Sequence, residues 1–251
     1  MTLEKKISNW IKNYLKNNNL SSLVVGVSGG IDSAVTSTLC AMTGYKTNLV
    51  IMPIHQKKNE TSRGIEHCKW LNENFLNVEV FQIDLSEAFD QFCHIFPDQL
   101  NDSLTLANTR ARIRMTSLYY IAGNTNGIVV GTGNKVEDFG VGFFTKYGDG
   151  GVDISPIADL MKSEVYELGE KLGILKSIML AAPTDGLWED ERTDEQQLGV
   201  TYDQLEWAMR FDGDEFSLND KQKSILSVYR KHRNKNFHKM KNIPIYKNEQ
   251  K

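Results

Sequence analysis

Residues 24–35, VVGVSGGIDSAV, join an apolar run to a helical pattern through two adjacent glycines. The apolar residues 24–27 predict a buried strand, and Ile31 with the apolar residues after it predicts the start of a helix. Between them, residues 28–30 form a turn in which glycine permits the left-handed backbone that tight turns use. A strand, a glycine turn and a helix in this order direct backbone N–H groups and a helix N-terminus toward an anion.

This turn differs from the common phosphate-binding loop because no Gly-Lys-Ser or Gly-Lys-Thr sequence ends it. Asp32 stands where that lysine would neutralise a triphosphate. A carboxylate beside phosphates makes sense only if a divalent cation lies between them, so the sequence predicts such a cation next to Asp32. The residues alone leave one alternative, an ordinary glycine turn before a helix that Ser28 or Asp32 caps.

The sequence SGGIDS after a strand resembles the loop of the N-type ATP pyrophosphatases, which cleave ATP between its α and β phosphates. In that superfamily the loop holds the departing pyrophosphate. The resemblance therefore implies that ATP contacts a continuous run of residues: Gly26, Val27, Ser28, Gly29, Gly30, Ile31, Asp32 and Ser33.

Four further motifs, in this order, resemble NAD synthetase: NTRARIRM, GTGNKVE, FFTKYGDGGVDISP and PTDGLW. The resemblance extends from about Ile7 to Pro244. Members of that family transfer AMP from ATP to the carboxylate of nicotinate adenine dinucleotide (deamido-NAD), and ammonia then displaces AMP to give the amide. The resemblance implies this activity here, a ligase for the last step of NAD biosynthesis that releases NAD, AMP and pyrophosphate.

That chemistry calls for Mg²⁺, lysines and N–H donors, because the attack of one anion on the α phosphorus expels another anion. The resemblance implies that Asp32 and Glu137 bind Mg²⁺, and each follows a predicted strand at the end where parallel sheets bind ligands. It also implies that Lys162 and Thr184 hold ATP phosphates. Thr132, just after the fourth predicted strand, resembles the family's other ATP contact.

The deamido-NAD contacts are also implied by matching positions. Arg112 matches an arginine that binds the dinucleotide. Lys146 and Asp153 flank the GDGG sequence and resemble the family's substrate contacts. His238 and Lys239 match a pair that closes over the substrate, although HKMK stands here where HKR or a close relative is usual.

Three further residues of these motifs have less defined roles. Asp149 is a candidate catalytic residue, either for a second Mg²⁺ or for guiding ammonia into place. Arg110 and Arg114 lie on other helical faces than Arg112, and a structural or a solvated role is open for both. Some relatives carry an ATP-binding arginine near Ile51 and Met52, so adenine contacts here are expected from backbone and apolar groups.

The elements that must position these residues alternate between strands and helices. Apolar strands are predicted at 23–27, 48–52, 78–83 and 127–131, and helices at 3–15, 32–42, 61–75, 104–122, 163–172 and 202–209. Near-continuous apolar strands separated by helices predict an open parallel sheet with helices on both faces. This α/β fold is Rossmann-like and, through the resemblance, similar to the adenine nucleotide alpha hydrolases.

Three segments depart from this alternation. Residues 131–156 are predicted to be a long working loop without regular structure, because they combine glycines with aromatic residues. Residues 183–199 are acidic and predicted to be exposed. Residues 231–251 are basic and weakly patterned, which indicates a tail or a segment that caps the substrate.

The chain has 251 residues, which fits one domain over residues 1–251. Only about 20 residues precede the first predicted strand, too few for the glutaminase domain of many NAD synthetases. Cys40, Cys68 and Cys93 are predicted to be free thiols within helices and not glutaminase nucleophiles. Free ammonia is the expected donor, and a glutaminase on a separate chain is left open.

The formal net charge of −3, without an extended basic block, gives no reason to expect nucleic acid as a partner. No apolar stretch reaches the ~20 residues that cross a bilayer, and the N-terminus is unlike a signal peptide, so a cytoplasmic protein without a membrane partner is expected.

The family's members are homodimers. The helix from residue 104 could supply a two-fold contact or equally an internal core, through Leu104, Ala111, Leu118 and Ala122.

Two other classes of function compete with this prediction. Within the superfamily, the chain could amidate a purine nucleotide or thiolate tRNA. Enzymes that amidate purine nucleotides are expected to lack the FFTKYGDGG motif that this chain carries, and the near-neutral charge disfavours tRNA as a substrate. Outside catalysis, it could be a nucleotide-binding regulatory module. The retention of Asp32, Glu137 and Lys162 argues against that reading.

Overall fold

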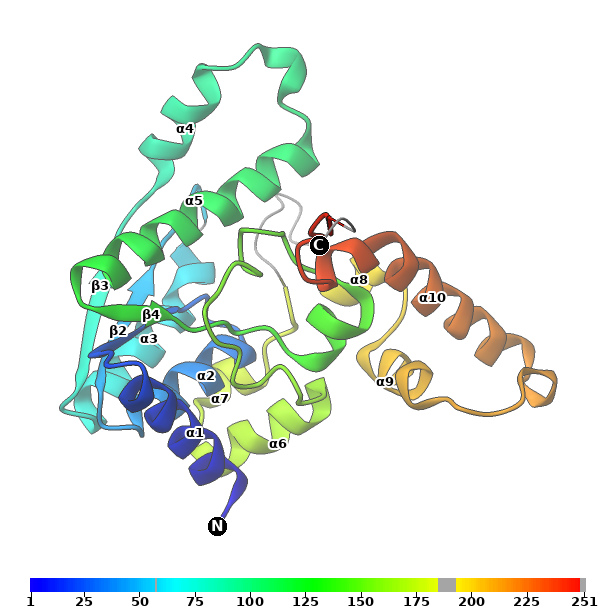
Figure 1. Cartoon of the computed structure of the whole chain (residues 1–251), viewed down its shortest axis with the longest axis horizontal. Coiled ribbons are helices and arrows are strands. Elements are labelled where there is room, and N and C mark those ends of the chain that lie inside the picture. The colour runs from blue at the N-terminus through cyan, green and yellow to red at the C-terminus, as the bar shows by residue number, and fades with distance from the viewer. Residues whose placement is uncertain (57, 185–192, 249–251) are drawn as a thin grey trace.

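The computed structural model describes residues 1–56, 58–184 and 193–248 of the chain (Figure 1). Within these ranges the chain forms one sheet of four parallel strands in the order β3-β2-β1-β4. The strands are β1 (Ser22–Gly26), β2 (Lys46–Ile51), β3 (Val78–Gln82) and β4 (Gly127–Val129). All four begin and end within about two residues of the predicted bounds.

The sheet buries both of its faces, because alternate residues of the central strands belong to two different hydrophobic clusters. Val25 and Leu49 pack on one face, and Val24 and Val50 pack on the other. Figure 1 shows the helices on both sides of the sheet. The predicted fold class, an open parallel sheet with helices on both faces, is confirmed.

The helices that supply buried residues to the first face are α1 (Leu3–Asn17), α2 (Ile31–Ala41), α3 (Lys58–Asn74), α6 (Lys162–Leu172) and the short α7 (Lys176–Met179). The other face is covered by α4 (Ser86–His94) and by α5 (Ser103–Asn124), the longest described helix. The short element η1 (Asp98–Leu100) lies between α4 and α5 in the chain.

The burial of side chains on α5 distinguishes between the two roles predicted for this helix, a two-fold contact and an internal core. Ala111, Leu118 and Ala122 are buried within the chain itself, so they serve its internal core. Leu104 is 56% exposed and is the one member of that set left at the surface. No described helix is long and apolar enough to cross a membrane.

A third hydrophobic cluster lies beyond the carboxyl ends of the strands. It is formed by η2 (Lys135–Val141), α8 (Asp194–Leu198), α9 (Tyr202–Arg210) and α10 (Asp220–Met240), with η3 (Glu215–Ser217) in the connection. Figure 1 shows α9 and α10 beside the body that holds the sheet.

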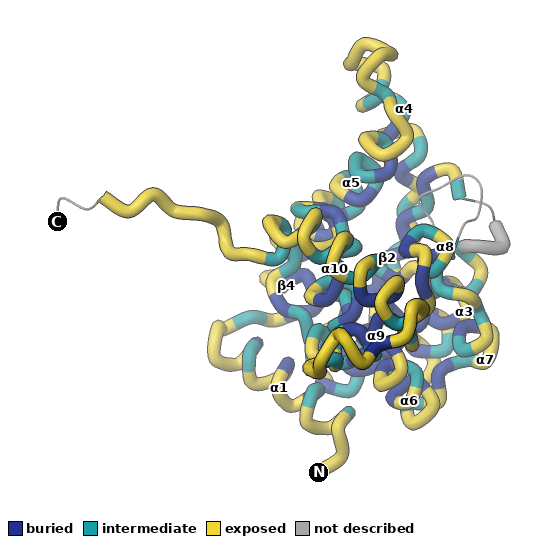
Figure 2. Tube along the Cα trace, turned by 90° about the vertical axis from the view of Figure 1, so that its right-hand side faces the viewer, coloured by how far each residue is buried: buried dark blue, intermediate teal, exposed yellow. Residues whose placement is uncertain are grey.

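Two predictions for this region were incomplete. Residues 131–156 are not without regular structure, because η2 is a π-helix of seven residues. Residues 231–240, predicted as part of a tail, are instead the second half of the helix α10. Asn219 and Gln222 form a capping box at the N-terminus of this helix. Residues 241–248 are exposed and extend away from the body (Figure 2), as a tail would.

Candidate active site

The glycine turn has the predicted geometry of strand, turn and helix. Gly29 adopts a φ of 86°, and a Cβ there would come within 2.8 Å of the backbone nitrogen of Gly64 on α3. Both the left-handed backbone and the close approach therefore require glycine. Within the turn, the N–H of Ser28 donates to the Ser33 Oγ at 3.2 Å, and that hydroxyl lies 3.0 Å from the carbonyl of Gly30.

The turn ends at Gly30, the N-cap of α2. The Ser28 Oγ accepts the N–H of Gly30 at 3.2 Å, but no side chain of the N-cap residue caps the first turn of α2, so neither Ser28 nor Asp32 is an ordinary N-cap. Asp32 instead lies in the first turn of the helix, where its side chain reaches residues from other elements. The backbone N–H groups at this N-terminus remain for a ligand, and the helix dipole favours an anion there.

Three residues that the sequence predicted for ATP and metal form one buried cluster. The Lys162 ammonium lies 2.6 Å from the Asp32 Oδ2 and 2.9 Å from the Glu137 Oε1. Asp32 comes from α2, Glu137 from η2 and Lys162 from the first residue of α6. The Lys162 side chain is only 4% exposed, so this cation is held between carboxylates rather than by solvent.

Sequence reasoning missed three side chains around this cluster. The Asn134 Nδ2 donates to the Asp32 Oδ1 at 3.1 Å, while its own Oδ1 caps η2. The Tyr202 hydroxyl donates to the Glu137 Oε1 at 2.6 Å and lies 3.2 Å from the Asp194 Oδ2. Asn134 belongs to the GTGNKVE motif and could have been found there, whereas Tyr202 reads as a core aromatic residue at a helix start.

The charges of the cluster depend on one another. Burial would lower the pKa of Lys162, but the two adjacent carboxylates outweigh burial and raise it, so the lysine is charged. Although burial opposes it, the charge of Lys162 and the hydrogen bond from Tyr202 lower the pKa of Glu137. Burial, with a contribution from the charge of Glu137, raises the pKa of Asp32. With both carboxylates ionised the cluster carries a net negative charge and attracts a further cation.

The donor set fits Mg²⁺ that arrives with a nucleotide. Mg²⁺ is usually bound by one or two carboxylates together with substrate phosphates and water. Asp32 and Glu137 are such a pair, and the Lys162 ammonium between them shows that a positive charge is accommodated there. In the described part of the chain, no three His, Cys, Asp or Glu residues gather into a complete metal site.

The FFTKYGDGG segment is held by contacts from α5 and α10. The Asp149 Oδ1 accepts the N–H of Thr145 at 2.9 Å, and the Lys239 Nζ donates to the carbonyl of Phe144 at 2.6 Å. The Arg112 Nε donates to the carbonyl of Lys146 at 3.3 Å. The structure thus brings four predicted site residues, Arg112, Lys146, Asp149 and Lys239, to one segment.

The remaining predicted substrate residues lie in other surroundings. The two Asp153 oxygens accept the N–H of Val129 at 2.8 Å and the hydroxyl of Tyr119 at 3.0 Å, so this carboxylate joins the segment to β4 and α5. Burial, with the charge of Asp153, raises the pKa of Tyr119 to about 12. His238 is exposed, one residue before the lysine that reaches the segment.

Thr132 is half-buried between β4 and η2, and Thr184 is exposed. The rest of the PTDGLW motif and part of the predicted acidic stretch, residues 185–192, lie outside the described residues.

The two arginines with open roles both make contacts within the chain. The Arg114 Nε donates to the carbonyl of Met52 at 2.9 Å, so Arg114 anchors the end of β2 to α5. The Arg110 guanidinium lies 4.6 Å from the centre of the Phe89 ring on α4. We therefore assign structural contacts to both side chains.

The far end of α10 holds the π-helix that carries Glu137. The Arg233 guanidinium donates to the carbonyls of Phe139 and Gly140, and the Asn236 Nδ2 donates to the carbonyl of Val141 at 2.9 Å. These are carbonyls at the C-terminal end of η2, where the helix itself provides no partners. The position of Glu137 therefore depends on a helix far along the chain.

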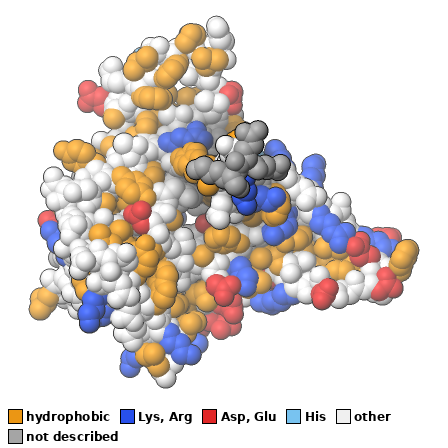
Figure 3. Space-filling view, viewed as in Figure 1, with side chains coloured by type: hydrophobic (Ala, Val, Ile, Leu, Met, Phe, Trp, Pro, Cys, Tyr) orange, Lys and Arg blue, Asp and Glu red, His pale blue; other side chains and the backbone are white. Residues whose placement is uncertain are grey.

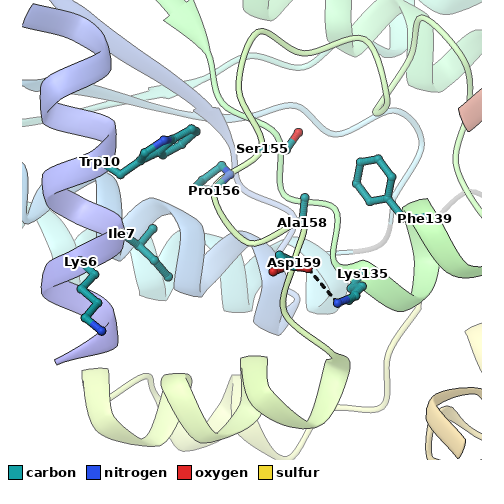
Figure 4. A pocket seen from close by; sticks show the side chains of 9 residues that line it. All are labelled: Lys6, Ile7, Trp10, Lys135, Phe139, Ser155, Pro156, Ala158 and Asp159. Atoms are coloured by element: carbon teal, nitrogen blue, oxygen red, sulfur yellow. Dashed lines mark hydrogen bonds and ion pairs between the residues drawn. The ribbon is translucent and has the colours of Figure 1, made fainter. Parts of the chain in front are cut away.

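A cavity of about 530 Å³ lies elsewhere, between α1 and residues 155–159 (Figure 4). Its walls include Trp10 and Phe139, and the Lys135–Asp159 ion pair, 2.8 Å long, lies at one edge. None of the residues predicted to bind nucleotide lines it. The carboxylate–lysine cluster and the cavity are therefore separate features.

Comparison with known proteins agrees with the motifs. A family model described as NAD synthase matches residues 3–249. An NH₃-dependent NAD⁺ synthetase of Carboxydothermus hydrogenoformans is 38% identical over 206 residues, which cover 80% of this chain and 82% of that one. A protein of the same name from Mycoplasma genitalium is 36% identical and covers 96% of this chain and 95% of its own.

Among solved structures, an NMN synthetase from Francisella tularensis superposes with a TM-score of 0.87 at 33% identity and covers 97% of each chain. An NH₃-dependent NAD synthetase from Campylobacter jejuni superposes with a TM-score of 0.78 at 26% identity and covers 98% of each chain.

Proposed function

Because the chain belongs to the NAD synthase family, we infer that it amidates deamido-NAD with ammonia in the last step of NAD biosynthesis. It is a ligase that forms a C–N bond and converts ATP to AMP and pyrophosphate. The full-length family match leaves purine amidation, tRNA thiolation and a purely regulatory role without support.

We propose that the carboxylate–lysine cluster at the carboxyl end of the sheet is the ATP site, and this cluster carries the proposal. The glycine turn and the N-terminus of α2 would hold the β and γ phosphates. Asp32 and Glu137 would hold Mg²⁺, which when bound neutralises charge on the phosphates and on the leaving pyrophosphate. Lys162 would contribute a further positive charge. Thr132 and Thr184 are proposed as additional ATP contacts.

The reaction then proceeds in two steps. An oxygen of the nicotinate carboxylate attacks the α phosphorus, and the bond to the pyrophosphate oxygen breaks. Ammonia next attacks the activated carbonyl carbon, loses a proton and expels AMP. We propose that Asp149 receives ammonium or accepts that proton, because its carboxylate belongs to the segment gathered by Arg112 and Lys239.

We propose that Arg112, Lys146, Asp153, His238 and Lys239 bind the nicotinate nucleotide. Contacts of Arg112 and Lys239 with one segment support a common site. Asp153 would have to exchange at least one of its contacts with Val129 and Tyr119 in order to bind substrate.

The nicotinate mononucleotide is a second candidate substrate. The Francisella structure with a TM-score of 0.87 is of an NMN synthetase, and its identity of 33% exceeds the 26% of the Campylobacter NAD synthetase. Both substrates present the same nicotinate carboxylate, so the same cluster would serve either one. They differ in the adenylate half, which the mononucleotide lacks.

One experiment separates the candidates. The purified protein is supplied with ATP, Mg²⁺ and ammonium, together with either deamido-NAD or nicotinate mononucleotide, and kcat/KM is measured for each. We expect the higher value for deamido-NAD, with AMP and pyrophosphate as products. A higher value for the mononucleotide would establish the second candidate. Release of ADP, or no amidation of either nucleotide, would refute both.

We also propose a homodimer and a cytoplasmic protein of one domain. The end of α4, η1 and the start of α5 project from the body as an apolar arm (Figure 2) and carry exposed apolar side chains at its tip (Figure 3). These are Phe92, Ile95, Phe96, Leu100 and Leu104, which are 43–74% exposed. Such a patch marks an interface, and a second copy is the partner that the family suggests. Sedimentation of I95D as a monomer beside a dimeric wild type would support this contact.

A further inference from the structure

Tyr202 is a neutral side chain that donates a hydrogen bond to Glu137, whose pKa is also lowered by a hydrogen bond from the Asn134 side chain. Its hydroxyl donates to Oε1 at 2.6 Å, and the centre of its ring lies 4.8 Å from the Lys162 Nζ. Lys162 donates to the same Oε1 at 2.9 Å. Both donors thus end on one oxygen of Glu137, and neither of these hydrogen bonds uses Oε2.

The two donors differ in how firmly they are held. Lys162 has a long flexible side chain, and under the proposed function it is attracted to phosphates that enter the site. Tyr202 is 7% exposed and packs in the third hydrophobic cluster. Its backbone N–H donates to the Glu195 Oε1 at 2.9 Å, and Thr201 caps the helix that begins with it. Its hydroxyl therefore stays at the same place whether or not Lys162 moves.

We propose that Tyr202 is a positioning residue that fixes the Glu137 carboxylate through Oε1 and leaves Oε2 directed to the cation that accompanies ATP. The inference rests on the proposed function, in which Glu137 binds Mg²⁺. A hydrogen bond to a ligating carboxylate sets its orientation and thereby the affinity for the metal. Tyr202 does not itself touch substrate or metal, and its effect passes through Glu137.

The test compares nucleotide binding with and without metal in the whole protein. Dissociation constants for α,β-methylene-ATP are measured by calorimetry, once with Mn²⁺ and once with a chelator present. In Y202F we expect the Mn²⁺-dependent affinity to fall about tenfold, while the affinity in the chelator is unchanged. A role in packing alone would weaken both affinities together or neither, and either result would overturn the proposal.

Two further variants complete the design. Y229F removes a hydroxyl from a partly buried tyrosine of the same hydrophobic cluster, so it controls for the loss of a phenol group. We expect wild-type values for it. In the E137Q background, Y202F should cause no further loss of turnover, because the residue acts through Glu137. An undiminished additional loss there would count against the proposal.

The binding measurement uses neither deamido-NAD nor the mononucleotide. A failure of the proposed amidation would therefore appear in the activity assay and not in this one. If Y202F instead changed nucleotide affinity equally with Mn²⁺ and with chelator, the positioning role would be refuted. The proposed amidation would not be affected by that result.

Discussion

The Lys162 Nζ lies 2.6 Å from the Asp32 Oδ2 although 130 residues separate the two side chains in the sequence. The lysine occupies the space between Asp32 and Glu137 in which a metal cation is expected, so it balances carboxylates that would otherwise repel each other. Under the proposed function, Asp32 and Glu137 would hold Mg²⁺, and the Lys162 ammonium would then be free to contact the phosphates of ATP.

The first prediction concerns this ion pair. In K162M, two buried carboxylates lose their cation, and we expect the free energy of unfolding to fall by about 3 kcal/mol and turnover to be lost. Urea denaturation and the amidation assay measure the two effects. The matched control is K135M, which removes an ion pair with the 95% exposed Asp159 and should cost less than about 1 kcal/mol. Equal losses in both variants would contradict the assigned role.

Acid sensitivity should depend on His67, which is fully buried and whose Nε2 lies 2.9 Å from the Ser37 Oγ. Burial lowers the pKa of His67 from 6.5 to about 4. Between these values the unfolded chain binds a proton that the folded chain does not, so stability falls as the pH drops from about 6.5 to about 4. The shift corresponds to about 3 kcal/mol, and no further loss from this group follows below pH 4.

H67Q removes this titration while keeping a polar side chain beside Ser37. Urea unfolding at pH 7 and pH 4.5 should therefore show a smaller difference in H67Q than in the wild type. H94Q, at an exposed histidine, is the control and should keep the wild-type difference. If H67Q retains the full acid dependence, other groups are responsible for it.

Asp149 offers a test of ammonia use. In D149N the amide oxygen can still accept the N–H of Thr145, so the segment keeps its turn and only the negative charge is removed. We expect the KM for ammonium to rise about tenfold or more with little change in the thermal midpoint. D159N, at a 95% exposed position, is the control. Unchanged amidation in D149N would exclude a role in the transfer of nitrogen.

The thiols test the expected nitrogen donor. Cys40 and Cys68 are buried, and burial raises the pKa of both, in Cys68 to about 12. Such thiols are poor nucleophiles, so we expect no amidation with glutamine as the sole nitrogen source and full activity in C93S with ammonium. Activity with glutamine that iodoacetamide abolishes would show a cysteine glutaminase and contradict this prediction.

The strands and the glycine turn could be predicted from the sequence because their signals are local. Apolar runs indicate buried parallel strands, and a glycine at position 29 is typical of the left-handed backbone conformation that other residues rarely adopt. The motifs likewise identified Asp32, Glu137 and Lys162, which the structure places in one cluster.

The rest depends on contacts between distant segments. The segment KVEDFGV of η2 has no helical period, and it forms a π-helix because Asn134 caps one end and α10 donates to carbonyls at the other. The second half of α10 is mostly polar and basic, so its pattern resembled a tail. Tyr202 meets Glu137 across 65 residues, and its own surroundings in the sequence indicate only a helix start.

The last prediction concerns the hydrogen bonds from α10 to the carbonyls of η2. Arg233 donates to the carbonyls of Phe139 and Gly140, which follow Glu137 by two and three residues, so R233M should loosen the turn that places this carboxylate. Loss of hydrogen bonds from a charged donor costs about 1.5–3 kcal/mol, most of it local to η2. We therefore expect faster hydrogen exchange in residues 135–141 and a several-fold fall in kcat/KM.

The same helix provides the control for this variant. R230M removes an ion pair with Glu215 in which both side chains are about half exposed, 49% and 53%, and such exposed pairs contribute little to stability. Exchange at residues 135–141 and kcat/KM should match the wild type in R230M. If both variants lower kcat/KM equally, the effect comes from the charge of α10 and not from the carbonyls of η2. If neither does, Glu137 is held in place by its own helix and by Tyr202 without help from Arg233.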